Sequence, residues 1–209
     1  MRQPIRLAVL LSGGGRSLQN LLDRIADGRL KAQVALVVSN RNDAGGLERG
    51  ERAGIPTAVA ERKDFSSREE FSRHIFDLCT AAKVDLVCLA GFLQLLHIPD
   101  DYLGRVLNIH PSLIPAFCGK GFYGHHVHEA ALAYGVKVSG CTVHFADNVY
   151  DHGPIVLQRV VPVLDEDTPD ILAARIFEQE CEAYPEAIQL FAEGRLRVTG
   201  RRTRIVMNL

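Results

Sequence analysis

The chain has 209 residues, of which 47% are hydrophobic and 23% charged, and its formal net charge is -1. This composition is typical of a globular protein with a sizeable core. The balanced charge argues against a dedicated nucleic-acid binder, whose affinity rests on a basic surface. The five cysteines have no paired spacing, and the sequence has no signal-peptide pattern and no apolar run long enough to span a membrane. We therefore expect a protein of the reducing cytoplasm.

The first half of the chain alternates strand patterns with helical ones. The run 5–11 is apolar except for Arg6, which predicts a parallel strand covered on both faces. The expected strands are 5–11, 34–38, 57–60, 84–90 and 106–110, and the expected helices are one from Leu18 to Gly28, one at 42–53, and one that follows Ser67 and carries Phe71, Ile75 and Leu78. This order predicts an α/β fold with a Rossmann-like, mostly parallel sheet and helices on both faces.

The second half changes character. A helix at 126–134 precedes two strand patterns, 138–145 and 155–161, whose short connection predicts an antiparallel hairpin. A long helix is expected from Thr168, a good N-cap with proline at the first helical position, to about Glu193. The arginine-rich tail from Arg195 is expected to add edge strands with a solvated basic face.

The strongest chemical signal is the end of the strand at 106–110. Asn108 and His110 interrupt an apolar run two residues apart, so both side chains point to one face of the strand. Pro111 ends the strand, and ligands of open α/β sheets bind at such carboxyl ends. With Asp151, from the loop between two later strands, they form a plausible set for acyl transfer, in which an amide stabilises an oxyanion and an imidazole moves protons. Read from spacing alone, a hydrogen-bonded core histidine and a turn aspartate remain the alternative.

A glycine loop follows the first strand. Gly13, Gly14 and Gly15 allow close backbone approach to a ligand, and the start of the next helix supplies free N–H groups that suit a phosphate. Arg16 and Ser17 add donors. The pattern is neither the dinucleotide nor the nucleoside-triphosphate motif, and a tight turn without a ligand is the alternative.

Two further features suggest ligands less directly. Glu180 interrupts an apolar stripe at spacing four on the long helix. A carboxylate in such a place costs free energy unless it is paired. Its partner is either an amine or sugar hydroxyl of a ligand or an internal arginine. His125, His126 and His128 with Cys118 match no common zinc spacing, so we expect no metal. His144 alternates with apolar residues on a strand and is interpreted as structural.

Together these residues resemble the phosphoribosylglycinamide formyltransferase branch of the formyltransferase family, over nearly the whole chain. The segments that carry the resemblance are 11–15, 17–19, 39–41, 90–92, 108–115, 140–145, Asp151 with 153–154, and 179–180. The segment 108–115 is common to formyltransferases, whereas the glycine loop and the Gln179–Glu180 pair point to the glycinamide ribonucleotide branch.

The resemblance implies a formyltransferase fold and direct transfer of a formyl group from 10-formyltetrahydrofolate to the amine of glycinamide ribonucleotide, in purine biosynthesis. It implies that Asn108, His110 and Asp151 are catalytic. The residues that it implies for glycinamide ribonucleotide are Gly13, Gly14, Gly15, Arg16, Ser17 and Glu180, and those for the folate are Leu93, Gln94, Leu95, Leu96, Asp147 and Asp151.

The resemblance also implies how the chain is organised and which partners it has. Residues 1–209 are expected to form one formyltransferase domain, with a phosphate-binding half at 1–104 and a catalytic, folate-binding half at 105–209. Its expected partners are the two small-molecule substrates, with neither nucleic acid nor a membrane, and a homodimer is left open.

The chain departs from the family pattern at three places. Gln94 stands where an arginine is usual, the segment 118–122 resembles a short insertion beside the site, and His152 replaces a small residue after Asp151. The rival functions are a formyltetrahydrofolate hydrolase, a catalytically silent phosphate- or folate-binding protein, and transfer to initiator tRNA. The first usually has an additional N-terminal domain and the last a basic C-terminal one, and we expect neither here.

Overall fold

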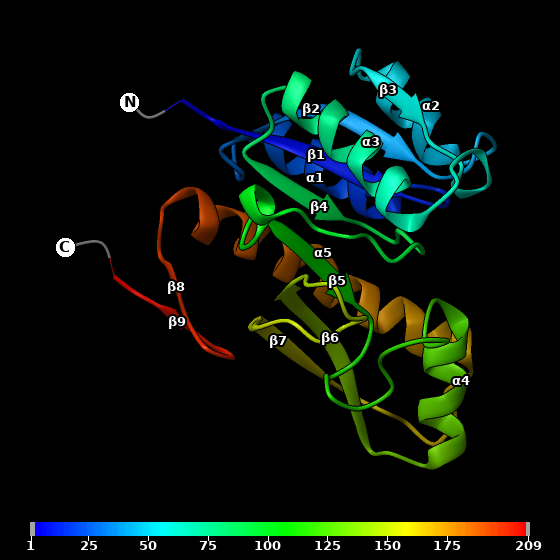
Figure 1. Ribbon diagram of the computed structural model, residues 1–209. Helices are drawn as coiled ribbons and strands as arrows, with labels where there is room; N and C mark the ends of the chain where they lie inside the picture. Colours follow the sequence, from blue (N-terminus) through cyan, green and yellow to red (C-terminus); the bar gives the residue numbers. More distant parts are fainter. Residues whose placement is uncertain (1–2, 208–209) are drawn as a thin grey trace. The chain divides into compact units, whose positions relative to one another are not determined.

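The computed structural model describes residues 3–207. It divides into two compact units, one that ends at Leu107 and one that begins at Asn108. Each unit contains strands with helices packed against them (Figure 1). None of the helices in the described residues combines the length and apolar character that a membrane span requires.

The first unit alternates strands and helices, as the periodicity predicts. Its strands are β1 (Ile5–Leu11), β2 (Ala32–Ser39), β3 (Thr57–Val59) and β4 (Leu86–Leu89); its helices are α1 (Arg16–Ala26), α2 (Gly45–Arg52) and α3 (Arg68–Ala81), with short 3-10 helices η1 (Arg62–Asp64) and η2 (Asp100–Tyr102). The strand order is β3-β2-β1-β4, and the pairs β1·β2, β1·β4 and β2·β3 are parallel. In Figure 1, α3 passes in front of these strands and α1 lies behind them. The side chains of β1 from Leu7 to Leu11 are fully buried, as expected for a strand covered on both faces.

The second unit contains the antiparallel strands. Its elements are the end of β5 (Val106–His110), α4 (His125–Tyr134), β6 (Val138–Phe145), β7 (Ile155–Pro162), α5 (Pro169–Ala192), β8 (Leu196–Thr199) and β9 (Arg202–Ile205). The β6·β7 and β8·β9 pairs are antiparallel, so the predicted hairpin and edge strands are confirmed. The helix α5 packs on β6 and β7, and α4 packs on α5. The α/β fold class with an antiparallel C-terminal half is thus confirmed.

Helix boundaries follow local hydrogen bonding. The hydroxyl of Thr168 accepts a hydrogen bond from the Ile171 N–H at 3.3 Å, so α5 begins where its N-cap and proline predict. The predicted start of α2 at Asn42 is wrong by three residues, since α2 begins at Gly45. Residues 42–43 form a turn before the helix instead, across which Arg41 donates two hydrogen bonds to the Asp43 carboxylate, at 2.9 and 2.7 Å.

The glycine loop is packed tightly against the start of α2. Gly15 has a left-handed backbone with φ of 72°, and a Cβ at this position would lie 2.6 Å from the Cα of Gly46. A Cβ on Gly46 would in turn lie 2.4 Å from a methyl carbon of the buried Leu11. The Gly46 N–H also donates to the Gly13 carbonyl at 3.0 Å. Glycines at 15 and 46 are therefore needed for the loop to approach α2 so closely.

The substitution Gly46→Ala tests this packing. Because the added methyl group must displace a side chain of the fully buried β1, we expect a loss of about 1–3 kcal/mol in the free energy of unfolding, measured by urea denaturation. The matched control is Gly45→Ala, whose Cβ would lie at an ordinary 3.6 Å from its nearest neighbour, the Gly14 Cα. It should change stability by less than about 0.5 kcal/mol or increase it. Equal losses in the two variants would contradict the packing described here.

Candidate active site

Strand β5 presents Asn108 and His110 on one face, as the alternation predicts. Both side chains face Asp151, which lies in the loop between β6 and β7. The Asn108 Nδ2 donates to Asp151 Oδ1 at 3.3 Å, and the His110 Nδ1 lies 3.6 Å from Asp151 Oδ2. His110 is only 4% exposed. The structure therefore brings the three predicted catalytic residues together within the second unit.

The carboxylate of Asp151 is held from several sides. Its backbone has a φ of 50°, which is rare outside glycine, and the Gly119 N–H donates to Oδ2 at 2.8 Å. Burial raises the pKa of Asp151, but the neighbouring His144 and His110 and the Gly119 N–H outweigh it, so the pKa lies below its ordinary value. The group is thus a carboxylate at neutral pH, fixed beside His110.

Burial has the opposite effect on His110. It lowers the pKa of the imidazole below its ordinary value, although Asp151 and a hydrogen bond to the Phe117 carbonyl favour the charged form. The Nε2 atom lies 2.9 Å from the Phe117 oxygen. A neutral imidazole next to a fixed carboxylate can gain and release a proton at moderate pH, as general acid–base chemistry requires.

His144 belongs to this cluster, which its interpretation as a structural residue did not anticipate. Its Nδ1 lies 2.8 Å from the Phe145 carbonyl oxygen, so Nδ1 carries the hydrogen and the neutral ring accepts at Nε2. The Nε2 atom lies 3.0 Å from Asn108 Nδ2 and 3.7 Å from Asp151 Oδ1. His144 therefore sets the orientation of the Asn108 amide, with its NH2 group toward Asp151 and His144.

The turn after His110 is fixed by a buried hydroxyl. Thr142 on β6 donates to the Ser112 carbonyl at 2.6 Å and accepts from the Ile114 N–H at 3.1 Å. Gln158 on β7 donates to the same hydroxyl at 3.0 Å. The segment that follows the catalytic strand is consequently tied to the β6·β7 hairpin that carries His144.

The glycine loop lies in the first unit, where Gly13, Gly14 and Arg16 are exposed. The loop leads into the first turn of α1, which begins at Arg16. Arg49 on α2 supports it from behind, because its Nε donates to the Gly14 carbonyl at 2.7 Å and its Nη1 to Gln19 Oε1 at 3.0 Å. This arrangement fixes an exposed backbone loop at a helix N-terminus, which is the geometry of a phosphate site.

The predicted folate segment also lies in the first unit, beside the glycine loop. Ser12 joins the two, since its N–H donates to the Gly91 carbonyl at 3.0 Å and its hydroxyl accepts from the Leu93 N–H at 2.9 Å. Leu93 is exposed, Gln94 and Leu95 are half-buried, and Leu96 is buried. Leu96 therefore contributes to the core of the unit, and the exposed part of the segment is its beginning.

The loop that contains Asp147 is linked to the basic tail. His152 Nδ1 lies 2.7 Å from Asp147 Oδ2, and the Arg201 guanidinium donates to His152 Nε2 at 2.7 Å. Arg201 is exposed, as expected for a solvated tail, and it also donates this hydrogen bond. His152, one of the departures from the family pattern, connects this arginine to a predicted folate residue.

Glu180 is half-buried on α5, opposite β6. Burial, with a further contribution from the Glu180 carboxylate, raises the pKa of Cys141 on β6 to about 12. The carboxylate thus lies close to the sheet of the second unit.

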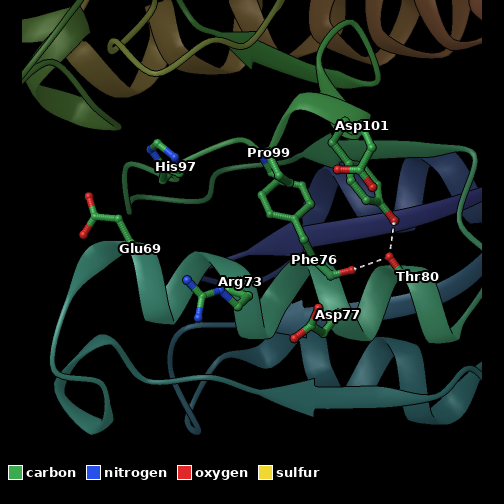
Figure 2. Close-up of a pocket in the computed structure, with 9 residues that line it drawn as sticks. Glu69, Arg73, Phe76, Asp77, Thr80, His97, Pro99 and Asp101 are labelled. Carbon is green, nitrogen blue, oxygen red and sulfur yellow. Dashed lines mark hydrogen bonds between the residues drawn. The ribbon is translucent and has the colours of Figure 1, made fainter.

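A cavity of about 350 Å³ opens in the first unit between α3 and the segment 97–102 (Figure 2). Its lining residues are Glu69, Arg73, Phe76, Asp77, Thr80, His97, Pro99, Asp101 and Tyr102. None of the predicted site residues is among them. Its three carboxylates outnumber its one guanidinium, that of Arg73, so the lining disfavours a phosphate or another anion, and we assign it no substrate.

Comparison with known proteins identifies the family of the chain. The model of the formyl transferase family matches residues 5–188. The chain belongs to the formyl transferase family. The phosphoribosylglycinamide formyltransferase of Haemophilus influenzae is 42% identical over 195 residues, which cover 92% of this chain and 90% of that protein. Among solved structures, glycinamide ribonucleotide transformylase 1 of Symbiobacterium toebii is 46% identical with a TM-score of 0.91, covering 99% of this chain and 96% of that one. The resemblance stated from the sequence is confirmed.

Other relatives within the formyl transferases differ in length and activity. The trifunctional purine biosynthetic protein adenosine-3 of Drosophila melanogaster is 44% identical over 193 residues, and this chain spans only 14% of its length. A formyltetrahydrofolate deformylase of Pseudomonas syringae pv. tomato is 26% identical with a TM-score of 0.86, covering 97% of this chain and 66% of that chain. The formyl transferase fold thus serves both transfer and deformylation.

Several contributors to the site were missed from the sequence. His144 and Thr142 are buried polar residues two positions apart on β6, the same pattern that identified Asn108 and His110, so alternation could have found them. Arg49 carries no such signal, because an arginine on an amphipathic helix is ordinarily solvated.

A buried histidine on α4 should make the stability of the fold depend on pH. His128 is 5% exposed, and within the described residues its Nδ1 has no hydrogen-bond partner. Burial, together with His125 and His110, lowers its pKa to about 4. Since the unfolded chain binds the proton near pH 6.5, stability falls as the pH drops from there toward 4.

Between pH 7 and pH 5, the free energy of unfolding of the wild type should fall by about 2 kcal/mol more than that of the His128→Gln variant. The measurement is urea denaturation at both pH values. His126→Gln, on the exposed face of the same helix, should keep the wild-type difference. A wild-type pH dependence in His128→Gln would contradict the assignment of a neutral buried ring.

Proposed function

We propose that this chain transfers the formyl group of 10-formyltetrahydrofolate directly to the amine of glycinamide ribonucleotide. The observation that carries the proposal is the meeting of Asn108, His110 and Asp151 at the end of β5. A further support is the state of Cys118, whose thiol pKa is raised by burial and by the Asp151 carboxylate. A protonated thiol is a poor nucleophile, so the attacking group belongs to the substrate.

In the proposed mechanism, the substrate amine attacks the formyl carbon and the negative charge develops on the formyl oxygen. Of the two Asn108 amide hydrogens, one is accepted by His144 at 3.0 Å and the other only weakly by Asp151 at 3.3 Å. The weakly bonded hydrogen is the one that turns to the oxyanion. Protonated His110 places a positive charge beside the oxyanion, and Asp151 stabilises that charge. The amine proton leaves through water, and the folate nitrogen leaves with a proton.

The two substrates would use the remaining predicted residues. The loop 13–17 suits the ribonucleotide phosphate, because its exposed backbone stands at the start of α1. We assign Glu180 to the glycinamide ribonucleotide, and residues 93–96 with Asp147 to the folate. We further propose that 1–209 acts as one formyltransferase domain in the cytoplasm, without a metal.

The main rival is hydrolysis of the same formyl donor, which is the activity named for the Pseudomonas relative. An absorbance assay of folate deformylation, run with and without glycinamide ribonucleotide, distinguishes the two. Deformylation that depends on the amine supports transfer. Equal rates without it would establish the hydrolase, and no deformylation in either case would favour a silent binding protein.

The substitution Asp151→Asn tests the charge without changing the shape. Asparagine tolerates the left-handed backbone as aspartate does, so the variant should fold. We expect kcat to fall by about 10²–10⁴-fold, the usual contribution of a general acid–base pair. The kcat values of Asn108→Ala and His110→Ala should fall similarly. Near-normal turnover in all three variants would overturn the assignment of the site.

Arg49→Met tests the support of the glycine loop. Losing the bond to the Gly14 carbonyl should raise the KM for glycinamide ribonucleotide about tenfold, the effect of one charge-assisted hydrogen bond, with little change in kcat. The control is Arg52→Met on the same helix, whose guanidinium makes an exposed ion pair with Glu48 at 3.5 Å and should leave KM unchanged. An unchanged KM in Arg49→Met would mean that the loop does not bind this substrate.

A further inference from the structure

Both ring nitrogens of His110 face hydrogen-bond acceptors. The Nε2 atom lies 2.9 Å from the Phe117 carbonyl oxygen, and Nδ1 lies 3.6 Å from Asp151 Oδ2. A carbonyl oxygen has no hydrogen to donate, so this contact is a hydrogen bond only when Nε2 carries the hydrogen. The two contacts are unequal, because only the one to Phe117 is within hydrogen-bond distance.

The Phe117 carbonyl is itself held in position. Phe117 has a left-handed backbone with φ of 49°, which costs a residue with a side chain about 1 kcal/mol or more. The Ser112 hydroxyl donates to the Ala116 carbonyl at 2.6 Å and lies 3.3 Å from the Phe117 carbonyl. The Phe117 ring makes edge contacts with the rings of Phe122 and Tyr134, at centroid distances of 6.4 and 5.9 Å. These contacts offset the backbone strain.

The same short segment also reaches Asp151. Two residues after Phe117, the Gly119 N–H donates to Asp151 Oδ2 at 2.8 Å. Residues 116–119 therefore contact His110 through a carbonyl and Asp151 through an N–H group. Because the backbone spacing between these two groups is fixed, the segment sets where the imidazole and the carboxylate stand relative to each other.

We infer that the Phe117 carbonyl fixes neutral His110 in the Nε2–H tautomer, and that the ring of Phe117 positions this carbonyl. The proton that His110 gains and releases is then carried on Nδ1, beside Asp151. Phe117 is a positioning residue, which acts on the reaction only through His110. The catalytic consequence rests on the proposed function, whereas the tautomer does not.

The titratable groups around His110 are consistent with proton uptake on Nδ1. Asp151, from the β6–β7 loop, faces Nδ1 and attracts the proton. His144 on β6 and His128 on α4 are the other ionisable side chains that interact with the ring, and a positive charge on either would oppose the proton. Cys118 interacts with Asp151 rather than with His110.

The test is the tautomer of His110 in the substrate-free protein, read from the ¹⁵N chemical shifts of the two ring nitrogens, with the His110→Gln variant identifying the signal. We expect the Nε2–H form in the wild type. Phe117→Ala removes the ring but keeps the backbone carbonyl, and it should shift the ring toward the mixture of tautomers seen in free histidine. It should also lower the His110 titration midpoint and reduce kcat about tenfold by misplacing the imidazole.

Two further variants separate positioning from general damage. Phe117→Tyr retains the ring and should restore the wild-type tautomer and kcat. Tyr123→Ala removes an exposed ring of the same loop, whose centroid lies 5.2 Å from that of the His126 ring. This variant should resemble the wild type in both measurements.

An Nδ1–H tautomer in the wild type would overturn the inference, as would a wild-type tautomer and titration in Phe117→Ala. Either result leaves the proposed function standing, because the ring nitrogens are observed without turnover. Absence of formyl transfer with the Nε2–H tautomer present would instead reject the function and retain the tautomer.

Discussion

The carboxylate of Asp151 is the charge on which the second unit's site depends. Its oxygens accept hydrogen bonds from the Asn108 amide and the Gly119 N–H. The imidazole rings of His110 and His144 lie beside it. A charge so far removed from water is stable only when its lone pairs are satisfied. Strand β5 supplies the Asn108 donor and His110, the segment after Pro115 supplies the Gly119 N–H, and β6 supplies His144, which orients the Asn108 amide.

In the first unit, the glycine loop exposes backbone groups rather than a charged side chain. Close packing of Gly15 on Gly46 and the bond from Arg49 hold the glycine loop open while its outer surface remains exposed. Ser12 then connects this loop to Leu93, at the start of the predicted folate segment. The loop is thus ordered before any ligand binds, which reduces the conformational entropy lost on binding.

The sequence was sufficient for those features that repeat with a period. Alternation on β5 predicted that Asn108 and His110 share a face, and the apolar runs predicted the parallel strands and the hairpin. Contacts made by the main chain were not predictable, because the Phe117 carbonyl and the Gly119 N–H exist in every residue type. The start of α2 was misplaced because residues 42–43 form a turn before the helix, and the sequence pattern does not distinguish such a turn from a first helical turn.

The contact between Gly119 and Asp151 has a consequence for divergence within the family. A hydrogen bond from a backbone N–H does not depend on the side chain that carries it. The exposed Ala116 and Lys120 can therefore be replaced while the carboxylate keeps its donor, whereas Phe117 and the positive-φ glycines cannot. Substitutions at these two exposed positions would alter the surface beside Asp151 and leave the contacts of its carboxylate in place.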